Sequence, residues 1–174
     1  MAQKDIVFVS INYRVGIFGF LAHPELSAEA AYGSSGNYAL LDMIAALKWI
    51  KENISAFGGD PNQVTIAGQS AGAFAVNFLC ASPLAKGLFQ GAIAESGASM
   101  LPSPLRPAIT KAQAENNGLD WATKLGTKSL ADLRALSADA IQKAGGNASP
   151  YSDGYVLPLA MPDIYAKGLQ NDVP

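Results

Sequence analysis

A serine flanked by glycines at a fixed spacing is the feature of this sequence with the clearest chemical meaning. The run Gly68-Gln69-Ser70-Ala71-Gly72 matches the G-x-S-x-G pattern of a nucleophile elbow and stands between a predicted strand and a predicted helix. A chain that turns at once from strand to helix strains the residue at the turn, and we expect side chains at positions 68 and 72 to collide there. Ser70 is therefore predicted to act as a nucleophile, and the Ala71 N–H to stabilise an oxyanion.

Catalysis by a serine also needs a base and an acid, and the sequence offers poor candidates for both. The single histidine, His23, precedes Ser70, whereas the base follows the nucleophile in elbow enzymes, so we interpret His23 as a loop or surface residue. Asp153 is a tempting acid, but Asp-Gly is also a common turn, and the turn is favoured. Ser96 ends a predicted strand, where it either borders the active site or forms a strand-end turn.

The composition indicates a folded chain and excludes several classes of function. Of the 174 residues, 49% are hydrophobic and 15% are charged, which excludes an intrinsically disordered protein. The net charge is −2 without a Lys/Arg cluster, which argues against nucleic acid or an anionic membrane as a partner, and no apolar run suits a membrane span. One Cys and one His exclude a disulfide scaffold and a His/Cys zinc cage, so we expect no cofactor and no metal. Cys80 is expected to be a free, buried, inert thiol.

Hydrophobic patterning in the first half predicts alternating strands and helices. Residues 6–13 are rich in β-branched side chains and predict a strand buried on both faces. Residues 37–57 predict an amphipathic helix that Ser35 or Asn37 caps and that Gly58-Gly59 ends, because apolar side chains recur every three or four positions. A strand over 63–67, a helix over 71–81 and a strand over 91–95 follow. Crossovers of this kind make a parallel sheet with helices on its faces, so the fold class is α/β.

The second half has a different pattern. Residues 107–125, 129–135, 137–145 and 162–167 predict helices, and residues 146–158 predict a loop. No boundary resembles a flexible linker. We therefore expect a helical excursion from the sheet rather than a second domain.

Beyond the elbow, the sequence resembles the type-B carboxylesterases, the family that includes the cholinesterases. The resemblance spans almost the whole chain, and its most specific part covers residues 57–72. The matching runs, in order along the chain, are NYRVG (12–16), FGFL (18–21), GN (36–37), LD (41–42), ALKWI (46–50), NI (53–54), FGGDP (57–61), VTIAGQSAG (64–72), SPL (82–84), GLF (87–89), ESG (95–97), LR (133–134), DG (153–154) and LP (157–158).

This resemblance implies an α/β-hydrolase fold and hydrolysis of small-molecule carboxylic esters through an acyl-enzyme on Ser70. Gln69 stands where many family members have Glu, and Asp132 replaces a Cys that several eukaryotic members use in a disulfide. The family's counterpart of Arg14 pairs with an acid upstream, so we expect Arg14 to be structural and without that partner here.

The family pattern also predicts that the chain is the central part of one hydrolase domain, with a sheet core over 1–100 and an excursion and return loop over 101–174. The triad acid and histidine are expected beyond Pro174, and the remaining oxyanion amides before Ile6. Two alternatives stay open: a catalytically inactive, cholinesterase-like binding or adhesion protein, and a serine peptidase or amidase of the same fold.

Overall fold

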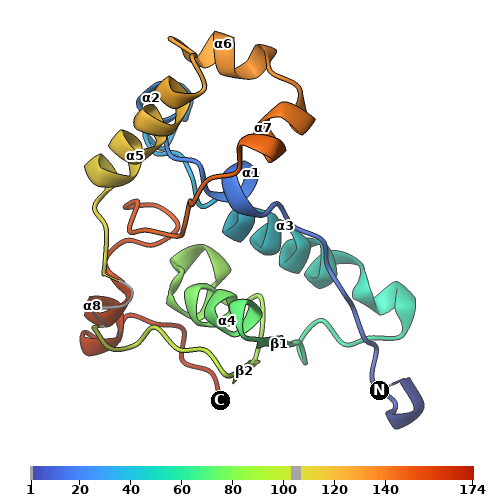
Figure 1. The fold of residues 1–174 in the computed structure, drawn as a ribbon. Helices are drawn as coiled ribbons and strands as arrows, with labels where there is room; N and C mark the ends of the chain where they lie inside the picture. Colours follow the sequence, from blue (N-terminus) through green and yellow to red (C-terminus); the bar gives the residue numbers. More distant parts are fainter. Residues whose placement is uncertain (1, 103–106) are drawn as a thin grey trace.

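The computed structural model describes residues 2–102 and 107–174 (Figure 1). Its sheet has two parallel strands, β1 (Thr65–Gln69) and β2 (Gly91–Glu95), and the helix α4 (Ala71–Ala81) lies between them in the chain. All five residues of β1 pair with β2. α4 packs against both strands, so the predicted parallel strand–helix–strand unit is confirmed.

The predicted bounds of this unit are confirmed for α4 and β2, whereas β1 begins and ends two residues later than the predicted 63–67. At its start, the Val64 N–H binds the side-chain Oε1 of Gln90 (2.9 Å) instead of the backbone of β2. At its end, Gly68 and Gln69 remain paired with β2. β1 therefore runs directly into the turn that precedes α4.

The strand predicted for residues 6–13 is wrong. The segment follows a 3-10 turn, η1 (Ala2–Lys4), and no strand among the described residues pairs with it. Ile6 and Phe8 are 52% and 65% exposed. β-Branched and aromatic residues favour an extended backbone, but a strand also needs a hydrogen-bonded neighbour. The pattern thus indicated the backbone conformation and not the pairing.

The helix predicted over 37–57 is the α-helix α3 (Tyr38–Asn53) continued by the 3-10 turn η2 (Ile54–Phe57). Gly58, in the left-handed conformation, ends η2 as predicted. One face of α3 is buried, and it consists of Ala39, Leu40, Met43, Ile44, Leu47 and Ile50. This face supplies the apolar surface against which the rest of the chain packs.

Buried polar groups tie the loop 146–158 to the start of α3. Asn37 occupies the N-cap position without a side-chain cap, and its carboxamide donates to the Tyr151 carbonyl (2.8 Å) and accepts from the Tyr151 N–H (3.3 Å). The Tyr151 hydroxyl donates to the carbonyl of Ser35 (2.6 Å). The N-cap position predicted for Asn37 is therefore confirmed, whereas its side chain binds the loop and does not cap the helix.

The main hydrophobic core lies between α3, α4 and α8 (Met161–Ala166) (Figure 1). The turn η3 (Pro83–Ala85) closes it beyond α4. Its most buried large side chains are Leu40, Leu157, Ile164 and Val156. Because α4 belongs to this core, the helix that follows Ser70 is fixed along most of its length.

Three of the helices predicted in the second half are confirmed as α5 (Lys111–Lys124), α6 (Leu130–Ala135) and α7 (Ala138–Ala144). α5 begins later than predicted because Thr110 caps it in a capping box with Gln113. Figure 1 shows these helices gathered with α1 and α2 at the end of the molecule away from the sheet.

Two short helices, α1 (Gly16–Phe20) and α2 (Pro24–Glu29), were not predicted, because their segment is rich in glycine and contains a proline. Pro24 is the first residue of α2, a position where its missing N–H costs nothing. Arg134 of α6 binds Glu29 through two hydrogen bonds of 2.8 and 2.7 Å. Among residues 2–102 and 107–174, no helix has the length and apolar character needed to cross a bilayer.

Candidate active site

Ser70 lies at the junction between β1 and α4, in a backbone conformation that few residues other than glycine adopt. Its φ is 52° and its ψ is −114°. The backbone is held on both sides: the Ser70 N–H donates to the Glu95 carbonyl (2.9 Å), and the Phe74 N–H donates to the Ser70 carbonyl (3.1 Å). The serine itself is exposed. The junction therefore has the strained geometry predicted from the motif.

The steric requirement for glycine falls on one side of Ser70 only. A Cβ atom at Gly68 would lie 2.3 Å from the backbone C and O of Gly72, so no larger residue fits at position 68. A Cβ atom at Gly72 would meet nothing within 4 Å among the described residues. The predicted collision is thus confirmed for position 68 and wrong, within the described part of the chain, for position 72.

Ala71 and Gln69 flank the serine on either side. Ala71 is the first residue of α4, where backbone N–H groups have no partner within the helix and carry the positive end of its dipole. Gln69 is the last residue of β1 and pairs with Glu95 of β2. Both residues are exposed, and the Ala71 N–H belongs to the first turn of the helix that follows Ser70.

Ser96 follows directly after β2, at the same end of the sheet as Ser70. It is exposed and has a φ of 60°. Each of the two neighbouring strands is therefore followed directly by a serine with a positive φ. The position fits either alternative from the sequence, a residue at the site border or a strand-end turn.

Two supporting residues at this junction were not predicted. A Cβ atom at Gly97 would lie 2.8 Å from the carbonyl oxygen of Ser70 and 2.9 Å from the Cβ of Ala73. Asn77 of α4 donates from Nδ2 to the carbonyl of Gly97 (3.1 Å). The run ESG at residues 95–97 was a signal for Gly97, whereas nothing in the local sequence marks Asn77.

His23 is a buried residue that caps α2, and none of its hydrogen bonds involves Ser70. It is 2% exposed and caps α2, where its Nδ1 accepts a hydrogen bond from the Glu25 N–H (3.2 Å). Its backbone N–H and carbonyl both bind the hydroxyl of Ser35 (3.0 and 3.1 Å). Of the two predicted alternatives, the loop position is confirmed, because His23 precedes the first residue of α2, and the surface position is wrong.

Asp153 forms a local turn, as favoured from the sequence. Its Oδ1 accepts from the N–H groups of Tyr155 (3.1 Å) and Leu157 (2.9 Å), and Gly154 follows with a φ of 80°. Asp153 is 8% exposed, which places it inside the fold rather than at the exposed elbow.

Arg14 has a partner, contrary to the expectation from the family pattern. Its guanidinium binds Asp42 of α3 through Nε (2.8 Å) and Nη2 (2.7 Å), and it lies 5.1 Å from the ring centre of Tyr38. The hydrogen bonds from Arg14 lower the pKa of Asp42. Arg14 therefore pairs with an acid within the chain, and the expectation that it lacks a partner is wrong.

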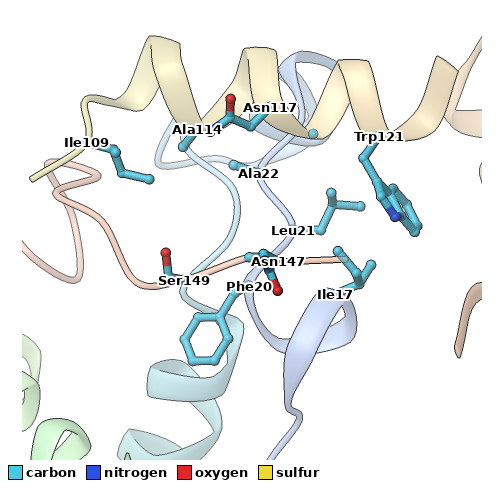
Figure 2. A pocket seen from close by; sticks show the side chains of 12 residues that line it. Ile17, Phe20, Leu21, Ala22, Ile109, Ala114, Asn117, Trp121, Asn147 and Ser149 are labelled. Carbon is cyan, nitrogen blue, oxygen red and sulfur yellow. The ribbon is translucent and has the colours of Figure 1, made fainter. Parts of the chain in front are cut away.

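Ser70 lines neither of the two cavities described in the structure. One, of about 60 Å³, lies between α1, α5 and residues 147–149, and Figure 2 shows Phe20, Trp121 and Asn147 around it. The other, of about 250 Å³, lies between α4, β2 and α8, and Cys80 lines it. Cys80 is free and buried as predicted, and burial raises the pKa of its thiol.

Residues 2–102 and 107–174 contain no group of three His, Cys, Asp or Glu side chains that could hold a metal ion. At the elbow, an exposed serine lies next to the first backbone amide of a helix, which is an arrangement that suits nucleophilic attack with stabilisation of an oxyanion.

Comparison with known proteins identifies the family. A model of the carboxylesterase family matches residues 1–173. The chain is 43% identical over 182 residues to the fumonisin B1 esterase of Sphingopyxis macrogoltabida, which covers 100% of this chain and 33% of that protein. It is 47% identical over 146 residues to the para-nitrobenzyl esterase of Bacillus subtilis (strain 168), covering 82% of this chain and 27% of that protein. The chain belongs to the carboxylesterase family.

A solved structure supports the same conclusion about the fold. A PNB esterase superposes with a TM-score of 0.78 and 39% sequence identity, over 94% of this chain and 36% of that chain. The predicted α/β-hydrolase fold, represented here by part of its sheet, is confirmed. The chain spans about a third of the length of the fumonisin B1 esterase that it matches.

Proposed function

We propose that this chain is the central part of a single α/β-hydrolase domain in a serine esterase that hydrolyses small carboxylic esters, with Ser70 as its nucleophile. The observation that carries the proposal is the backbone of Ser70, strained between β1 and α4 with the residue exposed. Strain of this kind persists only where the surrounding structure holds it, and it gathers at functional sites. Membership of the carboxylesterase family supports the same assignment.

The reaction follows from the chemistry of the hydroxyl. The Ser70 oxygen attacks the ester carbonyl carbon, its proton passes to a base, and the tetrahedral oxyanion forms beside the Ala71 N–H. The ester C–O bond then breaks, and the alcohol leaves with the proton from the base. Water hydrolyses the resulting acyl-enzyme by the same two steps and frees Ser70. Ser96, at the same end of the sheet, borders the bound ester.

The base and the acid of this reaction come, in the proposal, from segments that the relatives contain and this chain does not span. His23 and Asp153 are engaged in a helix cap and a turn. We place the acid soon after the position of Pro174, the histidine later, and further oxyanion amides before Ile6. This order of serine, acid and histidine is that of the α/β-hydrolases.

The relatives favour an ester over an amide substrate. The two reported above carry the names fumonisin B1 esterase and para-nitrobenzyl esterase, and the superposed structure is also named an esterase. These names favour neither a peptidase nor an inactive adhesion protein. No residue described here identifies the particular ester, so the proposal extends to the substrate class alone.

A kinetic comparison tests the proposal. The parent protein, meaning the product of the longest reading frame that contains residues 1–174, is assayed with p-nitrophenyl acetate and with the matching anilide. We expect faster cleavage of the ester, and a loss of at least about a thousandfold in kcat for Ser70→Ala. Ser96→Ala changes a residue at the border of the site and not the nucleophile, so its loss of kcat is expected to be much smaller than that of Ser70→Ala. Faster cleavage of the anilide would assign the protein to the amidases.

A further inference from the structure

Two strained residues lie side by side at the elbow, and the fold has to hold both. Four non-glycine residues in the described chain have a positive φ, and two of them are Ser70 and Ser96, which follow the paired strands β1 and β2. The Ser70 N–H donates to the Glu95 carbonyl, which links the two strand ends through the backbone. Strained backbone of this kind relaxes unless neighbouring groups prevent it.

The segment that follows β2 packs against the first turn of α4. A Cβ atom at Gly97 would lie 2.8 Å from the Ser70 carbonyl oxygen and 2.9 Å from the Cβ of Ala73. This approach leaves no room for a side chain at position 97, so the backbone of Gly97 packs directly against Ser70 and Ala73. A side-chain hydrogen bond from α4 to this segment adds a directional link to that packing.

Asn77 supplies such a link. It is 2% exposed, and its Nδ2 donates both to the Ala73 carbonyl in the first turn of α4 (2.7 Å) and to the Gly97 carbonyl (3.1 Å). The backbone carbonyl of Asn77 accepts from the Tyr165 hydroxyl of α8 (3.3 Å). One buried carboxamide thus joins the helix that carries Ser70 to the segment that carries Ser96.

We propose that Asn77 is a positioning residue for the nucleophile: its two hydrogen bonds hold Ser70 in the orientation needed for attack. This inference rests on the proposed function. A side-chain nitrogen with two N–H donors satisfies both carbonyls at once, whereas an aspartate at the same position has no donor and brings a negative charge toward them. Because the Asn77 side chain is buried, the loss of either hydrogen bond would leave a carbonyl without this partner and lower the stability of the fold.

The test compares Asn77→Asp and Asn77→Ala with the wild-type parent protein. Active sites are titrated with a phosphonate ester, so that kcat is expressed per reactive serine. We expect kcat to fall about 10- to 100-fold in both variants, because small displacements of a reacting group carry losses of that size. KM is expected to stay within about threefold, because the Asn77 side chain is only 2% exposed.

The control is Val76→Ala, on the same helix and 4% exposed, but without a polar contact to the elbow. It is expected to lower the melting temperature and to leave kcat per titrated site unchanged. An unchanged kcat in both Asn77 variants would overturn the inference, and so would an equal fall of kcat in Val76→Ala. Full activity in Ser70→Ala would instead overturn the proposed function, so the two failures are distinguishable.

Discussion

At the scale of single residues, the account depends on the backbone around Ser70. A positive φ at a serine is unfavourable on its own, and here it is combined with a contact at Gly68 that admits no side chain. The position of the hydroxyl is therefore set by backbone sterics as well as by packing of α4.

The first prediction concerns this contact. Gly68→Ala places a methyl group 2.3 Å from the backbone of Gly72, so β1 and α4 must separate. We expect a loss of at least about 1–3 kcal/mol in stability and a large fall in esterase activity. Thermal unfolding and p-nitrophenyl acetate hydrolysis of the parent protein measure both.

The matched control for this prediction is Gly72→Ala, on the other side of Ser70. A Cβ atom there meets nothing within 4 Å among the described residues. We expect the stability of Gly72→Ala to stay close to that of the wild type. A Gly68→Ala variant as stable as Gly72→Ala would show that the steric contact is not what shapes the elbow.

At the scale of elements, structure governed by neighbours along the chain was predictable. α4 and β2 have the predicted bounds because their apolar pattern, and the glycines that flank them, act locally. The segment 6–13 was misjudged because strand pairing depends on a partner that the local pattern does not reveal. α1 and α2 were missed because glycine and proline in a short stretch usually indicate a loop.

The ion pair between Arg14 and Asp42 anchors the extended segment to α3, and its contribution depends on pH. Hydrogen bonds from Arg14 lower the pKa of Asp42 below the usual value of about 3.9. The contribution is therefore complete above that pH and is lost as the pH falls through the lowered value.

We expect Asp42→Asn to lower the stability of the parent protein by at most about 1 kcal/mol at pH 7, since Arg14 is half exposed. The difference from the wild type should shrink in acid as Asp42 becomes protonated. Denaturant unfolding at pH 7 and pH 3 measures it. A difference that grows on acidification would contradict the role assigned to this pair.

A further prediction concerns the contact between the loop 146–158 and the start of α3. Tyr151→Phe removes the hydroxyl that donates to the buried Ser35 carbonyl (2.6 Å). We expect a loss of about 1–2 kcal/mol in stability with kcat unchanged, because the loop lies at the start of α3 and away from the elbow.

Burial raises the pKa of Tyr151 to about 12. The wild type should therefore lose stability above about pH 10, where an unfolded tyrosine ionises, and Tyr151→Phe should lose less.

At the scale of the whole molecule, the site is only partly formed by the described residues. Ser70 and Ala71 were predictable because the motif is contiguous. The contacts of Gly97, Asn77 and the Arg14–Asp42 pair were not, because each joins segments that only the fold brings together, although the run ESG marks Gly97 itself. Among the described residues the sole histidine caps α2, so no base is placed at Ser70.

We accordingly expect the 174-residue chain, expressed alone, to show little or no esterase activity. Without a positioned base the Ser70 hydroxyl stays protonated at neutral pH and is a weak nucleophile. Exposed apolar side chains such as Ile6 and Phe8 also favour aggregation. The assay is p-nitrophenyl acetate hydrolysis by soluble, monomeric chain beside its Ser70→Ala variant. Ser70-dependent turnover at ordinary enzyme rates would return His23 and Asp153 to consideration as catalytic residues.

The identity of the nucleophile is the central claim, and covalent labelling tests it most directly. The parent protein is treated with an organophosphonate ester, digested, and its peptides are mapped by mass spectrometry. We predict one adduct, on Ser70, formed in parallel with loss of esterase activity and absent from Ser70→Ala. An adduct on Ser96 or on any other serine, with Ser70 unmodified in the inactivated protein, would contradict the account.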